Sequence, residues 1–138
     1  MKTLLFALVT MFTVSLVSAS EVVIEVQAIA GKSKQEVTSV LGNPSSCTGS
    51  KLGEKCRYDK GESEIIFING KSDWITIEGL NSIPYSADAL MALGLKASKP
   101  SFKNEFTIRW VHIQGLLEVS VFPSGTNVDY AYIKVRTK

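Results

Sequence analysis

Two cysteines are the residues of this 138-residue chain whose type and spacing have the most definite chemistry. Cys47 and Cys56 lie nine positions apart in the stretch SSCTGSKLGEKC. A redox-active pair is usually Cys-x-x-Cys, and a zinc site needs two further ligands although the chain has a single histidine, His112. In an oxidising compartment the simplest product is a disulfide that closes a glycine-rich loop. We therefore predict a structural disulfide and no metal site.

The remaining candidates for catalysis are His112 and a group of carboxylates. His112 lies in a run typical of a strand, where a single histidine is more often a structural residue than a base. Four carboxylates surround one predicted turn, where solvated charges also discourage pairing between strand edges: Glu62, Glu64, Asp73 and Glu78. The sequence contains no Gly-x-Ser-x-Gly elbow, phosphate-binding loop or metal-binding helix motif. We expect a protein without enzymatic activity or cofactor, and a hydrolase using His112 is the alternative.

The turn among these carboxylates is Asn69-Gly70, which joins two β-rich runs. Asn-Gly supplies the two positive φ angles that a type I′ hairpin needs. In the register of a two-residue turn, Ile66 faces Asp73. Lys71 and Asp73 then reach solvent at the tip, and the core side carries Ile66, Ile68, Ile75 and Ile77. The opposite side carries Ile65, Phe67, Trp74 and Thr76.

A helix is predicted before this hairpin. Ser33 and Glu36 form a capping-box pattern, apolar residues follow at helical spacing, and Gly42 with Pro44 ends the helix. A short strand around residues 56–58 then leads into the hairpin. The first half thus has the order helix, strand, strand, strand.

The second half repeats this order. Ser86 can cap a helix that ends at Gly94, and three strand-like runs follow over residues 106–113, 116–122 and 128–136. We predict an α+β fold of two α-β-β-β units, about residues 29–79 and 84–137, that form one antiparallel six-stranded sheet with helices on one face. An accidental recurrence of common elements is the alternative explanation.

One face of such a sheet has no helix over it. Apolar and polar residues alternate along the predicted strands, so the uncovered face carries a mixed aromatic and charged set. Tryptophan, tyrosine and arginine are the residue types most enriched at protein-binding hot spots. The predicted protein-binding residues are Phe67, Trp74, Arg109, Glu118, Tyr130 and Tyr132. A one-residue change of register instead sends Trp74 into the core.

The first 19 residues have the layout of a secretory signal peptide. Lys2 is followed by an apolar run over residues 4–17 and by small residues up to Ala19. This run is shorter than the roughly 20 apolar residues of a spanning helix. We expect cleavage before Ser20, an exported single domain over residues 20–138, and no stable membrane anchor, because no cysteine near the cut offers a lipidation site.

The charge balance bears on the class of partner. The whole chain has 15 basic and 13 acidic residues, a net charge of +2. Nucleic-acid binders usually display clustered lysine and arginine, so we expect no nucleic-acid partner. Lys96, Lys99 and Lys103 are loosely grouped around a proline, as in a solvated loop.

The stretch GKSKQEVTSVLGNP, followed by a β-meander, resembles the helix-opening pattern of the SmpA/OmlA-like small outer-membrane lipoproteins. The resemblance covers about residues 29–78. Those lipoproteins share an α+β fold with the β-lactamase inhibitor protein, which looks like two such units in tandem. The resemblance implies an envelope binding or assembly module without chemistry of its own. This chain lacks the lipid-bearing cysteine of the lipoproteins and is much shorter than the inhibitor, so neither anchoring nor inhibition is carried over.

Together these features predict an exported, periplasmic or secreted, non-catalytic module of the bacterial envelope that binds a protein partner through the uncovered sheet face. The first alternative is a periplasmic carrier of a small molecule or glycan that stacks on Trp74 or Trp110. A structural envelope component without a discrete site is the second.

Overall fold

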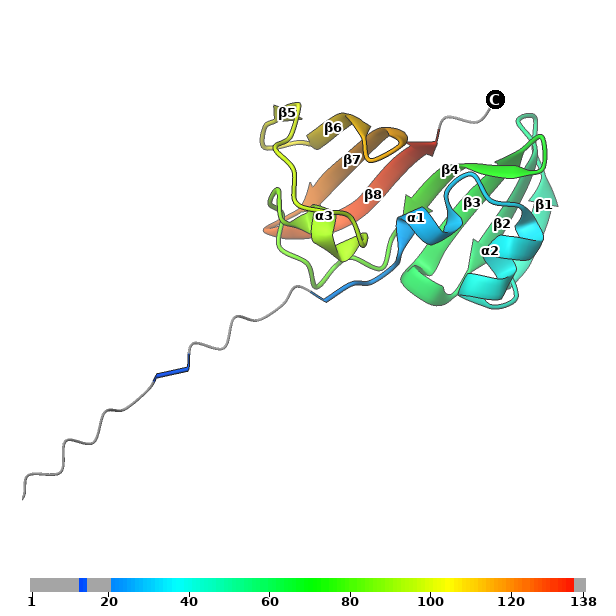
Figure 1. Ribbon diagram of the computed structural model, residues 1–138, viewed down its shortest axis with the longest axis horizontal. Coiled ribbons are helices and arrows are strands. Elements are labelled where there is room, and N and C mark those ends of the chain that lie inside the picture. The colour runs from blue at the N-terminus through cyan, green and yellow to red at the C-terminus, as the bar shows by residue number, and fades with distance from the viewer. Residues whose placement is uncertain (1–12, 15–20, 136–138) are drawn as a thin grey trace, which may run out of the picture.

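The computed structural model describes residues 13–14 and 21–135 (Figure 1). The predicted signal peptide lies outside the described residues except for Thr13 and Val14. In the part of the chain after residue 20, none of the described helices is long and apolar enough to cross a membrane.

An eight-stranded antiparallel sheet dominates the fold (Figure 1). Its strands follow the order β1-β2-β3-β4-β8-β7-β6-β5, so each half of the chain forms a four-strand meander and β4 pairs with β8 at the seam. The strands are β1 (Ser46–Gly49), β2 (Glu54–Tyr58), β3 (Ser63–Ile68), β4 (Lys71–Ile77), β5 (Phe102–Lys103), β6 (Ile108–Ile113), β7 (Leu116–Ser124) and β8 (Asn127–Val135).

The helices are short. They are α1 (Val26–Ile29), α2 (Lys34–Leu41) and α3 (Ala89–Ala92), with a 3-10 turn, η1, at Lys60–Glu62. The first half therefore has an eight-residue helix and the second a single turn. The fold is a sheet-rich one, and it matches the predicted pair of α-β-β-β units only loosely.

The predicted capping box is present at the start of α2. The Ser33 hydroxyl accepts a hydrogen bond from the Glu36 amide at 3.2 Å, and the Ser33 amide donates to Glu36 Oε1 at 3.3 Å. The predicted helix after Ser86 is shorter than expected. The Ser86 hydroxyl accepts from the amide of Asp88, so residues 86–88 form a turn and the helix begins only at Ala89.

The described helices pack on one sheet face, which we call the covered face. In Figure 1, α1 and α2 lie over the first half of the sheet and α3 over the second. One apolar cluster joins the inward strand residues to the helices. Its largest members include Trp110, Ile65, Ile75, Ile133 and Leu90. We call the opposite side the open face.

The hairpin at Asn69-Gly70 has the predicted positive φ angles, 52° and 76°. Its register differs from the prediction beyond the first two pairs. Phe67 pairs with Ser72, but a β-bulge then places Ile66 opposite Trp74 in place of Asp73. Because strand side chains alternate, this one-residue shift reverses the facing of β3.

Several predictions about faces are therefore wrong. Phe67 is 3% exposed on the covered face, not on the open face, and Ile65 lies beside it. Ile66 and Ile68 are half-buried on the open face and are not core residues. Asp73 does not reach solvent at the tip, since it is 3% exposed.

The segment before α2 explains the bulge. The Ser72 amide donates to the carbonyl of Lys32 at 2.8 Å, and the Gly31 amide donates to the Ser72 carbonyl at 3.0 Å. The Ser72 hydroxyl also donates to the carbonyl of Ile29, at the end of α1. These contacts fix Ser72 on the covered face, so Asp73 becomes the extra residue of the ladder.

Two strands were not expected from the sequence. β1 forms where a glycine-rich loop was predicted, with Cys47 directly opposite Cys56. β5 is a two-residue edge strand that pairs with β6. Phe106, where a strand was predicted to begin, lies before β6 and is 69% exposed.

Candidate functional site

The open face brings most of the predicted binding residues into one band. Across β4, β8, β7 and β6, Thr76 pairs with Tyr132, Tyr132 with Ser120, and Ser120 with Arg109. One row further along, Trp74 pairs with Lys134 and Lys134 with Glu118. The predicted residues on this face are Trp74, Arg109, Glu118, Tyr130 and Tyr132, and Phe67 is absent from it.

Four residues at the seam of the sheet form what we call the Trp74 cluster: Asp73, Trp74, Tyr132 and Lys134. The rings of Trp74 and Tyr132 meet edge to face, with centroids 5.9 Å apart. The ammonium group of Lys134 lies 5.1 Å from the centroid of the Trp74 ring and pairs with the Asp73 carboxylate. The bulge makes this possible, because it places Asp73 and Trp74 where both reach Lys134.

Sequence reasoning missed Asp73 and Lys134 as members of this cluster. Lys134 follows Tyr132 by two positions, so strand alternation alone was sufficient to place it on the same face. Nothing local to the hairpin places Asp73 there, because its position depends on the bulge.

A second polar group flanks the cluster on β6 and β7. Arg109 Nε lies 2.7 Å from Glu118 Oε1 and 3.3 Å from Ser120 Oγ, and the Ser120 hydroxyl donates to Glu118 at 2.8 Å. Burial raises the pKa of Tyr132, and the nearby carboxylates of Glu118 and Asp73 raise it further. The Tyr132 hydroxyl therefore stays a neutral hydrogen-bond donor at physiological pH.

Tyr130 lies apart from the Trp74 cluster. Its ring stacks on Phe122 with centroids 4.6 Å apart, and the two residues are paired across β8 and β7. The open face thus carries two aromatic pairs, one of which is bounded by ion pairs.

Two buried polar atoms at the bulge have no hydrogen-bond partner among the described residues. They are Asp73 Oδ1, which can only accept from a donor when ionised, and Trp74 Nε1, which can only donate. In the described part of the chain, Asp73 Oδ1 thus lacks a donor and Trp74 Nε1 lacks an acceptor.

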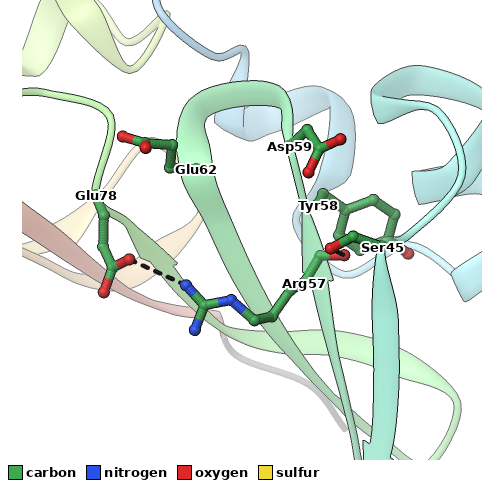
Figure 2. Close-up of a pocket in the computed structure, with 6 residues that line it drawn as sticks. All are labelled: Ser45, Arg57, Tyr58, Asp59, Glu62 and Glu78. Carbon is green, nitrogen blue, oxygen red and sulfur yellow. Dashed lines mark hydrogen bonds and ion pairs between the residues drawn. The ribbon is translucent and has the colours of Figure 1, made fainter.

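The predicted group of carboxylates is partly brought together in a hollow at one end of β2 (Figure 2). This hollow has a volume of about 320 Å³ and is lined by Ser45, Arg57, Tyr58, Asp59, Glu62 and Glu78. Figure 2 shows the Arg57 guanidinium turned toward Glu78, with N···O at 3.2 Å, and Arg57 also pairs with Glu64 at 3.1 Å. Asp73 lies elsewhere, in the Trp74 cluster.

The chemistry of this hollow is that of a solvated ion-pair network. The side chains of Arg57 and Glu78 are 50% and 52% exposed. Tyr58 is buried, and its hydroxyl is hydrogen-bonded to the Thr38 hydroxyl at 3.3 Å. Such exposed pairs contribute little stability.

His112 lies on the surface at the irregular end of β6, with a left-handed φ of 52°. It lines two shallow hollows of about 180 and 220 Å³. Among the described residues that line them there is no carboxylate to orient the imidazole. The Ser101 hydroxyl, in the larger of these two hollows, accepts a hydrogen bond from the Val111 amide at 3.1 Å.

The disulfide between Cys47 and Cys56 is present, as predicted. It joins β1 to β2 at a directly opposed pair, with the Cα atoms 4.1 Å apart. In the described ranges, the one group of three residues with metal-ligand geometry is Cys47, Glu54 and Cys56. The sulfur atoms of Cys47 and Cys56 form the disulfide, so neither is the thiolate that a metal site needs.

Comparison with known proteins finds no matching family model, no matching curated protein and no matching solved structure. The resemblance of residues 29–78 to the SmpA/OmlA-like lipoproteins therefore stays a prediction.

Proposed function

We propose that this chain is an exported, non-catalytic binding protein of the bacterial envelope that recognises a protein partner through its open sheet face. The observation that carries the proposal is the Trp74 cluster, which presents aromatic rings at the middle of the sheet. Disulfides persist in oxidising compartments, so the Cys47–Cys56 bond is consistent with export. The leader-like residues 1–19 and the resemblance of residues 29–78 support the same location.

The make-up of the open face favours a protein partner. Trp74, Tyr130 and Tyr132 are each half-buried, so their rings are fixed while part of each remains accessible. Rigid aromatic side chains bury much area on binding and lose little entropy. The pairs Arg109–Glu118 and Lys134–Asp73 border the rings with polar groups, an arrangement like the polar rim of a protein interface.

Site-specific photo-crosslinking in the periplasm tests the proposal. A photoreactive phenylalanine analogue replaces Tyr130 on the open face or Gln35, which is exposed on α2. We expect a discrete cross-linked protein at position 130 and none at position 35. A Trp74→Ala/Tyr132→Ala variant should lose this product, whereas Leu52→Ala, at an exposed residue of the β1–β2 turn, should retain it. Equal yields from all variants contradict the proposed face.

The unpartnered atoms at the bulge favour a second candidate, a carrier of a small hydroxyl-bearing molecule such as a glycan. Its hydroxyl groups would accept from Trp74 Nε1 and donate to Asp73 Oδ1, with a sugar ring against the indole. Both atoms are buried, so such a ligand must displace the side chains that cover them. Titration with purified glycans, read by tryptophan fluorescence, separates the candidates. Trp110 is 1% exposed, so a ligand response should vanish in Trp74→Phe and persist without any protein partner.

A further inference from the structure

The hairpin of β5 and β6 exposes two phenylalanines at an edge of the sheet. Phe102 is 49% exposed and Phe106 is 69% exposed, and Val111 on β6 is 44% exposed. By contrast, another phenylalanine of this chain, Phe67, is only 3% exposed. Figure 1 shows β5 at the far end of the sheet from β1, where the hairpin is an outer corner of the molecule.

Hydrogen bonds hold this hairpin in a defined shape. Asn104 Oδ1 accepts from the amides of Phe106 and Thr107 at 2.8 and 3.0 Å, and the Asn104 amide donates to the Thr107 carbonyl at 3.0 Å. The Tyr85 hydroxyl donates to the Asn104 carbonyl at 2.9 Å. Phe102 lies in β5, opposite Arg109. The exposure of the phenylalanines is therefore built into the turn and is not the result of a frayed end.

The charge around the phenylalanines is positive. Lys99 and Lys103 are exposed, and Glu105 is the one acidic residue between positions 96 and 106. Lys96 is also exposed, but it is hydrogen-bonded to Gln114 beyond the other end of β6. Within the described part of the chain, neither Lys99 nor Lys103 has an ion-pair partner. The nearest arginine on the sheet, Arg109, is already paired with Glu118. This corner thus combines exposed aromatic rings with unpaired positive charge.

We propose that the β5–β6 hairpin docks reversibly on the surface of an anionic lipid bilayer. Aromatic rings are favoured at the level of the lipid headgroups, where part of each ring leaves water. Each lysine near an anionic membrane surface adds electrostatic attraction that decays within a Debye length. The charge of the corner is complementary to anionic headgroups, and the phenylalanines supply the apolar contact. The hairpin borders the open face, because Phe102 pairs with Arg109, and the variants below distinguish membrane docking from recognition of a protein.

Co-sedimentation with lipid vesicles tests the proposal on the mature protein. Wild type should bind vesicles of phosphatidylglycerol and phosphatidylcholine, bind vesicles of phosphatidylcholine alone weakly, and dissociate as salt is added. Phe102→Ser/Phe106→Ser should lower the partition coefficient about ten-fold, from the apolar area lost. Lys99→Gln/Lys103→Gln should lower it about thirty-fold on anionic vesicles, from the two charges removed.

Two controls keep the result specific. Leu52→Ser changes an apolar residue that is 48% exposed on the β1–β2 turn, and it should bind vesicles as wild type does. Trp74→Ala/Tyr132→Ala should also bind normally, so failure of the proposed protein-binding face does not affect this test. The proposal is overturned if wild type does not bind anionic vesicles, or if the phenylalanine and lysine variants bind as well as wild type. A protein receptor for the hairpin would then be the better explanation.

Discussion

The ion pair of Asp73 and Lys134 is the residue-scale feature that matters most for the open face. The Asp73 side chain is 4% exposed and that of Lys134 is 25% exposed, whereas the other ion pairs of the described chain have partners from 26% to 52% exposed. A buried carboxylate is costly without a partner. The ion pair with Lys134 therefore offsets the free-energy cost of burying the Asp73 carboxylate. Lys134 also lies over the Trp74 ring.

We predict that Lys134→Ala lowers the free energy of unfolding by about 3 kcal/mol, because it leaves a buried carboxylate unpaired. Urea unfolding followed by circular dichroism measures this change. Lys55→Ala removes a lysine from the more exposed pair with Glu64 and should cost less than about 1 kcal/mol. Equal losses in the two variants would show that the Asp73 carboxylate does not depend on Lys134.

Gly79 is a second residue with a strong local constraint. A Cβ atom added at this position would lie 2.8 Å from the Gly61 carbonyl oxygen. The same oxygen accepts a hydrogen bond from the Gly79 amide at 3.0 Å, which holds the two segments together. Gly79→Ala should therefore destabilise the protein by about 1–3 kcal/mol through overpacking. In Gly49→Ala the new methyl group meets no atom within 4 Å, so its melting temperature should stay close to wild type. A melting temperature unchanged in both variants contradicts the close approach.

At the scale of elements, the start of α2 is set by its capping box. The Ser33 amide and hydroxyl hold the pKa of Glu36 below its ordinary value through hydrogen bonds to the carboxylate. A lowered folded-state pKa means that this stabilisation is present above the ordinary pKa of glutamate and is lost as pH falls through the folded-state value. The contribution thus disappears in acid and is complete at neutral pH.

Ser33→Ala removes the hydroxyl but keeps the backbone amide, which lowers the pKa of Glu36 most. The pKa should therefore rise only part of the way toward its ordinary value, as followed by NMR titration of the carboxyl carbon. Loss of the N-cap hydroxyl should also lower the free energy of unfolding by about 1 kcal/mol at neutral pH. Ser39→Ala is the control, because Ser39 lies within α2 and its hydroxyl donates only to the Glu36 carbonyl. A Glu36 pKa that is the same in wild type and Ser33→Ala would show that the Ser33 hydroxyl does not lower it.

The edge strand β1 depends on the disulfide. β1 pairs only with β2, and three of its four residues are exposed. A cross-link over nine positions restricts the unfolded chain, so reduction should lower the free energy of unfolding by about 2–3 kcal/mol. Urea unfolding with and without dithiothreitol measures the loss. A Cys47→Ala/Cys56→Ala variant should be insensitive to the reductant, and a wild type equally insensitive would contradict a stabilising disulfide.

At the scale of the whole molecule, the two meanders share one sheet through β4 and β8. Both seam strands are paired on each side and bury alternate residues under the helices. Backbone amides in such strands exchange only when much of the structure opens. Hydrogen exchange measured by mass spectrometry should be slowest in β4 and β8 and fastest in β5, which has two residues and one neighbour. Faster exchange in β8 than in β1 would show that the seam is not the stable centre.

Part of this fold could be read from short stretches of sequence. The start of α2, the Asn69-Gly70 turn, the Cys47–Cys56 pair and the open-face positions of Arg109, Glu118 and the tyrosines all depend on neighbours a few residues away or on strand alternation. Local preferences of this kind predict the structure correctly wherever the tertiary fold agrees with them. Trp74 also lies on the predicted face, although the register that placed it there was wrong.

The sequence by itself thus determined the cross-link, one helix start, the hairpin turn and the alternation of the second half. Only the tertiary structure decided the bulge at Asp73, because contacts between Ser72 and residues 29–32, some 40 positions away, hold Ser72 on the covered face. That single shift buries Phe67 and brings Asp73 to Lys134. A pairing register is set by what the whole sheet packs against, which no local pattern records.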